Sequence, residues 1–257
     1  MRPDDHAGTP GQVTFIAGVY NYCDRWCERC RFQTRCRLYR DTRRMEEFME
    51  GRLDKADLEA LQSDEEFEED TNAPPVSARE RAEFLEGLAE ANQEPSPEES
   101  ARIERAYERH TRQLDAHPLT RDAMEYATTS RRLVQILESA FHAGGDPLAA
   151  ESLETIGRFG LMIAVKTRRA AAGLLPLCEE LGDDEEFRQS DANGCAKLVR
   201  LMIAESRQAW ELLVHLPAVT ADGVPAAMVR RLDTLDARLA AEFPRAMSFV
   251  RMGLDEG

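Results

Sequence analysis

The sequence predicts an all-α fold in which an N-terminal knuckle of four cysteines precedes an antiparallel helical bundle. Three observations support this prediction. The 257 residues are rich in Ala, Leu, Glu and Arg, which favour helices, and only 7% are aromatic. In the C-terminal half, apolar residues recur at steps of three and four, the period of an amphipathic helix. No run of alternating apolar and polar residues indicates a strand.

The C-terminal half contains four amphipathic segments of about 20 residues each, a length typical of bundle helices. The first ends at AGGDP (143–147), and Asp146-Pro147 begins the second. Pro217 ends the third, and Pro244 is expected to kink or restart the fourth. The apolar stripes expected to face the core are Leu133, Val134, Leu137, Ala140 and Phe141; Leu153, Ile156, Phe159 and Ile163; Leu198, Met202, Ala209, Leu213 and Leu216; and Val229, Leu232, Leu235, Leu239, Phe243, Met247 and Val250.

Proline-rich and acidic stretches divide the rest of the chain. We expect a loose tail at 1–12, a cysteine knuckle with an acidic helical segment at 13–70, a linker with connecting helices at 71–119, and the helical bundle at 120–257. The run SDEEFEED (63–70) predicts a solvated acidic loop.

Local signals place further helix ends and loops. Residues 77–92 predict a helix, and the SPEE motif (96–99) predicts the start of another, with a cap, a proline in the first turn and acids next. A long loop is expected at 174–194. Its last part is expected to form a turn and a helix cap from Asp191, Asn193 and Gly194.

Four of the six cysteines lie within fourteen residues, as CDRWCERCRFQTRC with the spacing C-x3-C-x2-C-x5-C. These are Cys23, Cys27, Cys30 and Cys36. A helix or helical turn continuing from the apolar run at 13–22 would place the first three thiols on one face. Soft thiolates this close together suit Zn(II) or an iron–sulfur cluster.

The last three cysteines, in CERCRFQTRCRLY, have the spacing C-x2-C-x5-C. This stretch resembles the cluster loops of the WhiB-like regulators and of the endonuclease III class of DNA glycosylases. Both families carry a 4Fe–4S cluster on four cysteines, the last three spaced in this way. The resemblance implies that Cys23, Cys27, Cys30 and Cys36 hold such a cluster.

The chain lacks the Gly-Trp-Gly turn and basic tail of the regulators, and the helix-hairpin-helix and catalytic Asp of the glycosylases. The resemblance therefore implies the cofactor and not the activity of either family. The motif also resembles the start of a bacterial family of helical proteins, a resemblance that implies no function.

Two other interpretations of the cysteines remain. Four thiolates also make a structural zinc site, which would join the short segment to a domain. The triad C-x3-C-x2-C matches radical SAM enzymes as well, but those need a β/α barrel, and strands are not expected here.

Charge and hydropathy indicate which partners and which cellular location to expect. The formal net charge is −15, so the whole chain would repel nucleic acid and anionic membranes. Residues 13–44 carry eight arginines against three acidic residues, a net charge of +5, and residues 45–70 carry a net charge of −10. The arginines are expected to offset the charge of a metal–thiolate site or to lie against the acidic segment. No apolar stretch has the length of a transmembrane helix or resembles a signal peptide, which favours a cytoplasmic location.

Two Glu-x-x-x-His pairs, Glu138/His142 and Glu211/His215, form a candidate second metal site in the bundle core. The alternative is that both histidines stabilise helix C-termini. Among the other notable residues, Cys178 and Cys195 are expected to be small and partly buried, Trp26 to pack over the cysteine site, and Trp210 to lie in the core.

The functional hypothesis is therefore a cytoplasmic 4Fe–4S protein that acts as a redox-responsive or electron-transfer component. A protein partner is expected, and neither nucleic acid nor membrane. The alternatives are a zinc-stapled helical adaptor without a redox role and a di-metal helical-bundle oxidoreductase. The chain contains no Gly-rich phosphate loop, nucleophile elbow or H-E-x-x-H motif, so the sequence does not assign it an enzymatic activity.

Overall fold

The structure is a computed structural model of the whole chain. It describes residues 15–16, 18–57, 96–141, 146–175, 185–215, 223–251 and 253–255, without the side chains of 139–141 and 185–188. The predictions for the tail, the acidic loop, the linker and the helix at 77–92 lie outside these residues, as do those for His142, Cys178 and Leu216.

The all-α class is confirmed, because every regular element in the described ranges is helical. The α-helices are α1 (Arg37–Met49), α4 (Pro97–Ala116), α5 (Pro118–Phe141), α6 (Pro147–Ala172), α7 (Glu185–Val214) and α8 (Val224–Glu242). The 3-10 helices are η1 (Cys27–Arg29), η2 (Gln33–Arg35) and η5 (Ala246–Ser248). Within the described ranges, none of the helices is both long and apolar enough to cross a bilayer. The cysteine knuckle and the antiparallel order of the bundle stay predictions.

The chain divides into two compact units. One comprises residues 1–15 and 29–102, and the other comprises 16–28 and 103–257. The division falls between Glu28 and Arg29, inside the cysteine segment. Residues 16–28 therefore belong with the C-terminal helices.

Helix starts follow the local signals of the sequence. Ser96 and Glu99 form the reciprocal cap at α4, with the Glu99 carboxylate accepting from the Ser96 amide at 2.9 Å and the Ser96 hydroxyl accepting from the Glu99 amide at 3.3 Å. At α6, Asp146 accepts from the Leu148 amide at 2.9 Å, and Pro147 occupies the first turn. Both predicted starts are confirmed.

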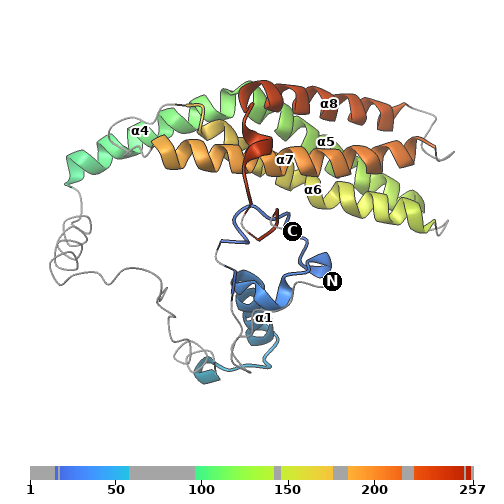
Figure 1. Cartoon of the computed structure of the whole chain (residues 1–257), viewed down its shortest axis with the longest axis horizontal. Coiled ribbons are helices and arrows are strands. Elements are labelled where there is room, and N and C mark those ends of the chain that lie inside the picture. The colour runs from blue at the N-terminus through green and yellow to red at the C-terminus, as the bar shows by residue number, and fades with distance from the viewer. Residues whose placement is uncertain are drawn as a thin grey trace. The chain divides into compact units, whose positions relative to one another are not determined.

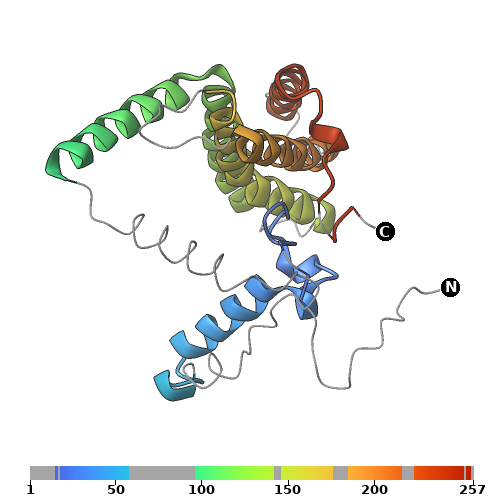
Figure 2. The ribbon, with the colours of Figure 1, turned by 60° about the vertical axis from the view of Figure 1, so that its left-hand side comes forward.

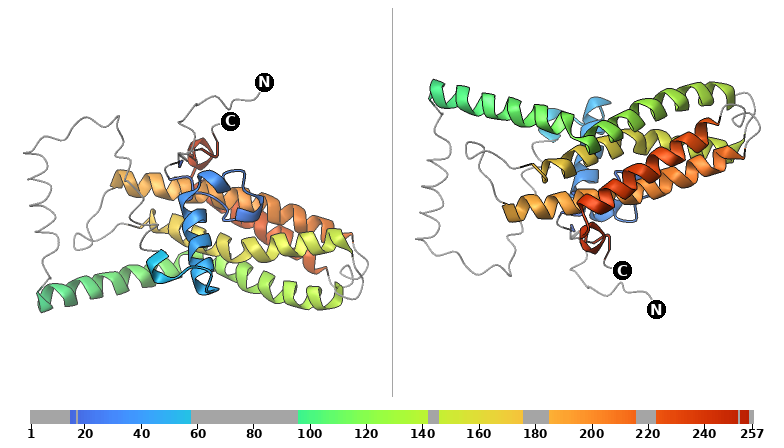
Figure 3. Two further views of the ribbon diagram at one scale, coloured as in Figure 1. Left: turned by 90° about the horizontal axis from the view of Figure 1, so that it is seen from below. Right: turned by 90° about the horizontal axis from the view of Figure 1, so that it is seen from above.

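Helices α5 to α8 surround the main core of the larger unit. Helix α6 packs against α5 and α7, and α8 packs against α7 and α5. Figures 1 and 3 show these four helices lying along one another. Helix α4 leads into α5 through His117, and Figure 2 shows the two helices meeting at an angle.

The predicted stripe of α6 is buried in full, as Leu153, Ile156, Phe159 and Ile163. Trp210 is also in the core, as predicted. The predicted core stripe of the last helix is wrong at its C-terminal end, because Met247 and Val250 are exposed. Helix α8 ends at Glu242, and after Pro244 the chain restarts only as the short η5, so the helical period does not reach them.

The loop predicted at 174–194 is wrong over its second half, because α7 begins at Glu185. Gly194 is a helix-interior residue and neither a turn nor a cap. A Cβ placed on it would lie 2.5 Å from Tyr22 Cε1 and 2.8 Å from Phe249 Cζ. Glycine is needed there for close packing of two rings, a signal that resembles a turn when only the sequence is read.

Candidate functional site

Residues 16–28, which carry Cys23 and Cys27, are packed onto the bundle through two aromatic anchors. The Tyr22 ring meets the Phe249 ring edge-on, with 4.8 Å between centroids. The Trp26 ring meets Phe159 of α6 edge-on at 5.5 Å and is only 5% exposed. Trp26 thus packs against the helical core, and its predicted packing over a cysteine site stays a prediction.

Two cationic side chains of α6 hold the backbone of this segment. Lys166 Nζ donates to the carbonyl oxygen of Asn21 at 3.1 Å. Arg158 donates to the carbonyl oxygen of Arg25 at 2.9 Å and pairs with the Glu28 carboxylate at 2.7 Å. The Arg158 guanidinium also lies 5.3 Å from the centroid of the Trp26 ring, within the range of a cation–π interaction. Contacts to carbonyls fix the path of the main chain itself.

A polar cluster on α6 and α7 anchors Tyr22. Asp191 accepts from the Tyr22 hydroxyl at 3.1 Å and receives two hydrogen bonds of 2.7 Å from Arg169. Burial, followed by the nearby Asp191 carboxylate, raises the pKa of Tyr22 to about 12. Burial likewise raises the pKa of the neighbouring Cys195 to about 11. Cys195 is fully buried and packs within the helical core.

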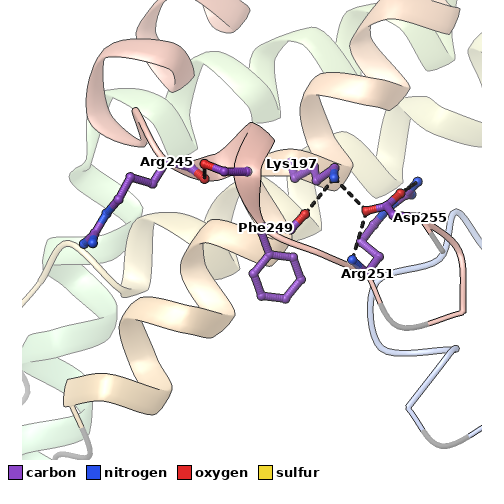
Figure 4. A network of polar contacts seen from close by, with 6 residues as sticks. Lys197, Arg245, Phe249, Arg251 and Asp255 are labelled. Carbon is purple, nitrogen blue, oxygen red and sulfur yellow. Dashed lines mark hydrogen bonds and ion pairs between the residues drawn. The ribbon is translucent and has the colours of Figure 1, made fainter.

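The C-terminal segment carries Phe249, the ring that Tyr22 contacts, and is itself held to α7. Figure 4 shows Lys197 reaching toward the Phe249 carbonyl and Asp255. Lys197 Nζ lies 2.6 Å from each of these two oxygens, and Asp255 also pairs with Arg251 at 2.7 Å. The Arg251 and Lys197 contacts hold the pKa of Asp255 far below its usual range, against a smaller opposing effect of burial. These contacts hold Phe249 where it meets Tyr22.

The backbone around the first two cysteines forms local turns and a short 3-10 helix, and not the continuous α-helix that was one of the two predicted alternatives. Residues 18–21 make a turn, and Cys27 begins the short η1. Arg25 has a φ of 60°, a left-handed conformation that an α-helix does not allow. The Asp24 carboxylate accepts from the Trp26 amide at 2.9 Å, which closes a local turn on either side of Arg25. The helical period of the sequence is thus interrupted where Trp26 enters the core.

Cys30 and Cys36 belong to the other compact unit. Cys30 Sγ is half-buried and accepts a hydrogen bond from the Phe32 amide at 3.4 Å. Cys36 is 8% exposed and immediately precedes α1. In the same unit, Arg40 stacks on Phe15 with 4.4 Å to the ring centroid, so this arginine of the basic stretch serves local packing.

The four predicted ligands are divided between the two compact units. In the ranges given above, the structure brings together no three His, Cys, Asp or Glu side chains suited to a metal ion. Cys23 and Cys27 are half-buried in the larger unit, and Cys30 and Cys36 lie in the smaller one. The assignment of these four cysteines as ligands stays a prediction.

The candidate second metal site has its described members on the surface. Glu138, Glu211 and His215 are exposed, and Glu211 lies 3.6 Å from Arg207 in an i,i+4 ion pair. His215 directly follows the last residue of α7, where a donor satisfies terminal carbonyls. His142 is outside the described residues. The structure thus does not place the described members in the bundle core.

The sequence did not predict that Arg158, Lys166 and the Asp191 cluster hold residues 16–28. One signal was present for Lys166, which stands three residues after Ile163 on the predicted core stripe. A lysine at a core position is buried only with a hydrogen-bonding partner, and Lys166 is 7% exposed. Its partner, the Asn21 carbonyl, is far away in the sequence and cannot be read from it.

Comparison of the chain with protein-family models, with curated proteins and with solved structures finds no match.

Proposed function

We propose that the protein is a cytoplasmic 4Fe–4S protein that acts as a redox-responsive or electron-transfer component, with Cys23, Cys27, Cys30 and Cys36 as ligands. The observation that carries the proposal is the set of four thiols within fourteen residues. A donor set made only of sulfur selects iron–sulfur clusters or zinc over hard cations. A bound cluster would supply reversible one-electron transfer.

The surroundings of the individual thiols support a thiolate site. The Phe32 amide donates to Cys30 Sγ, and hydrogen bonds to sulfur are among the features that tune the reduction potential of a cluster. Cys36 immediately precedes the first residue of α1.

Anaerobic purification followed by an absorption spectrum and by iron, sulfide and zinc analysis tests the proposal. We expect a brown protein with about four irons and four sulfides per chain, as the cluster type requires. Cys30→Ser should lose the cluster. Cys195→Ser, the matched control, should keep it. A colourless protein with one zinc would instead support the zinc-stapled adaptor.

A further inference from the structure

We propose that helix α6 positions the cysteine segment for metal binding, with Arg158 and Lys166 as positioning residues that raise metal affinity without touching the metal. The inference rests on the proposed function. It concerns Cys23 and Cys27, the two proposed ligands in residues 16–28.

The contacts from the bundle fall directly beside the two cysteines. Cys23 follows Tyr22, whose hydroxyl is bonded to Asp191, and lies two residues after Asn21, whose carbonyl accepts from Lys166. Cys27 stands between the buried Trp26 and Glu28, the ion-pair partner of Arg158. Each thiol therefore has an immediate neighbour that is held by the bundle.

The hydrogen bond of Lys166 forms only when residues 16–28 are packed on the bundle, because its acceptor is in that segment. Lys166 is 7% exposed, and a buried ammonium without an acceptor is strongly disfavoured. The Asn21 carbonyl supplies an acceptor at 3.1 Å. Docking of the segment and burial of this lysine therefore stabilise each other.

Arg158 connects three parts of the segment at once. It binds the Arg25 carbonyl, pairs with Glu28 and lies over the Trp26 ring. Arg25, which bears this carbonyl, is itself in the left-handed region with a φ of 60°, a conformation that is disfavoured for a residue with a side chain. The Arg158 hydrogen bond helps to hold this conformation and thereby fixes the direction in which the chain enters Cys27.

A ligand pair that is already fixed binds a metal more tightly than a flexible one, because less chain has to be ordered on binding. Partners that orient ligands from outside the coordination sphere typically change metal affinity by about 10–100-fold. By linkage, the metal should stabilise the bundle as much as the bundle strengthens metal binding.

The test measures the affinity of the metal-free full-length protein for Zn²⁺ by competition with a chromogenic chelator, anaerobically and with reduced thiols. The variant is Arg158→Gln. The matched control is Arg168→Gln, because Arg168 lies on the same helix, pairs with Asp115 at 3.0 Å and is similarly exposed. Circular dichroism checks that each variant is folded. Lys166→Met, which keeps an apolar stem, provides an independent variant.

We expect Arg158→Gln and Lys166→Met to weaken Zn²⁺ binding by about 10-fold or more. Arg168→Gln should match the wild type, and Arg158→Lys should restore part of the affinity because it keeps the charge beside Glu28. A folded Arg158→Gln and Lys166→Met that bind Zn²⁺ as tightly as the wild type would overturn the positioning role alone. A wild-type protein that binds neither Zn²⁺ nor iron would overturn the proposed function and this inference together.

Discussion

Replacing Gly194 by alanine tests the packing that holds the cysteine segment to α7. The new Cβ would lie 2.5 Å from Tyr22 Cε1 and 2.8 Å from Phe249 Cζ. The rings cannot move apart freely, because Tyr22 is hydrogen-bonded to Asp191 and meets Phe249 edge-on. Overpacking of this kind costs about 1–3 kcal/mol. Alanine inside a helix contributes about 0.5–1 kcal/mol in the opposite direction.

Gly157→Ala is the matched control for this experiment. Gly157 is also inside a helix, but its Cβ would lie at an ordinary 3.6 Å from Val134 Cγ1. The control should raise the free energy of unfolding by about 0.5–1 kcal/mol. Since the gain in helix propensity is common to both variants, Gly194→Ala should be less stable than Gly157→Ala by about 1–3 kcal/mol.

Urea denaturation followed by circular dichroism gives both values. In a Tyr22→Ala background the penalty at Gly194 should shrink, because the nearer contact is gone. Equal stabilisation by Gly194→Ala and Gly157→Ala would refute the packing of Tyr22 and Phe249 on α7.

Three further substitutions test other contacts. Asp255→Asn should lower stability at neutral pH, because only the ionised carboxylate pairs with Arg251 and Lys197. The difference from the wild type should disappear as the pH falls below the usual value of 3.8 toward the depressed pKa of the folded state, and a difference independent of pH in acid denaturation curves would contradict this. In urea denaturation, Arg25→Val should be less stable than Arg25→Gly by about 1–2 kcal/mol, because only glycine adopts the left-handed conformation without cost. Equal stability of the two variants would exclude a left-handed conformation at residue 25. Tyr126→Phe should cost about 1–3 kcal/mol, because it leaves the buried Nε1 of Trp210 without its 3.2 Å acceptor. Trp210→Phe should therefore cost less in the Tyr126→Phe background than in the wild type, and an equal cost in both would argue against the bond.

The sequence predicted the features that depend on near neighbours in the chain. The cap at Ser96, the start of α6 at Asp146 and the apolar stripe from Leu153 to Ile163 all follow from signals a few residues apart. Local spacing also identified the four cysteines as a group, although the structure does not test what they bind.

The features that were missed depend on partners distant in the chain. Gly194 indicated a turn, but its reason is the rings of Tyr22 and Phe249. The sequence likewise contained no sign of the contact between Trp26 and Phe159 of α6. A one-dimensional pattern records that a residue is small or aromatic and not what it contacts, so the packing of residues 16–28 onto the bundle could not be predicted.

The proposed positioning role of α6 depends on one structural statement, that residues 16–28 are an integral part of the helical unit. The two tryptophans allow a direct measurement. The double variant Trp210→Phe/Tyr126→Phe removes both partners of the buried hydrogen bond and leaves Trp26 as the fluorescent reporter. Urea unfolding is followed by Trp26 fluorescence and by circular dichroism of the helices, with a chelator present. Coincident transitions are predicted, because Trp26 is packed in the same core as α6. A fluorescence change at lower urea, completed while the helices remain folded, would contradict the statement.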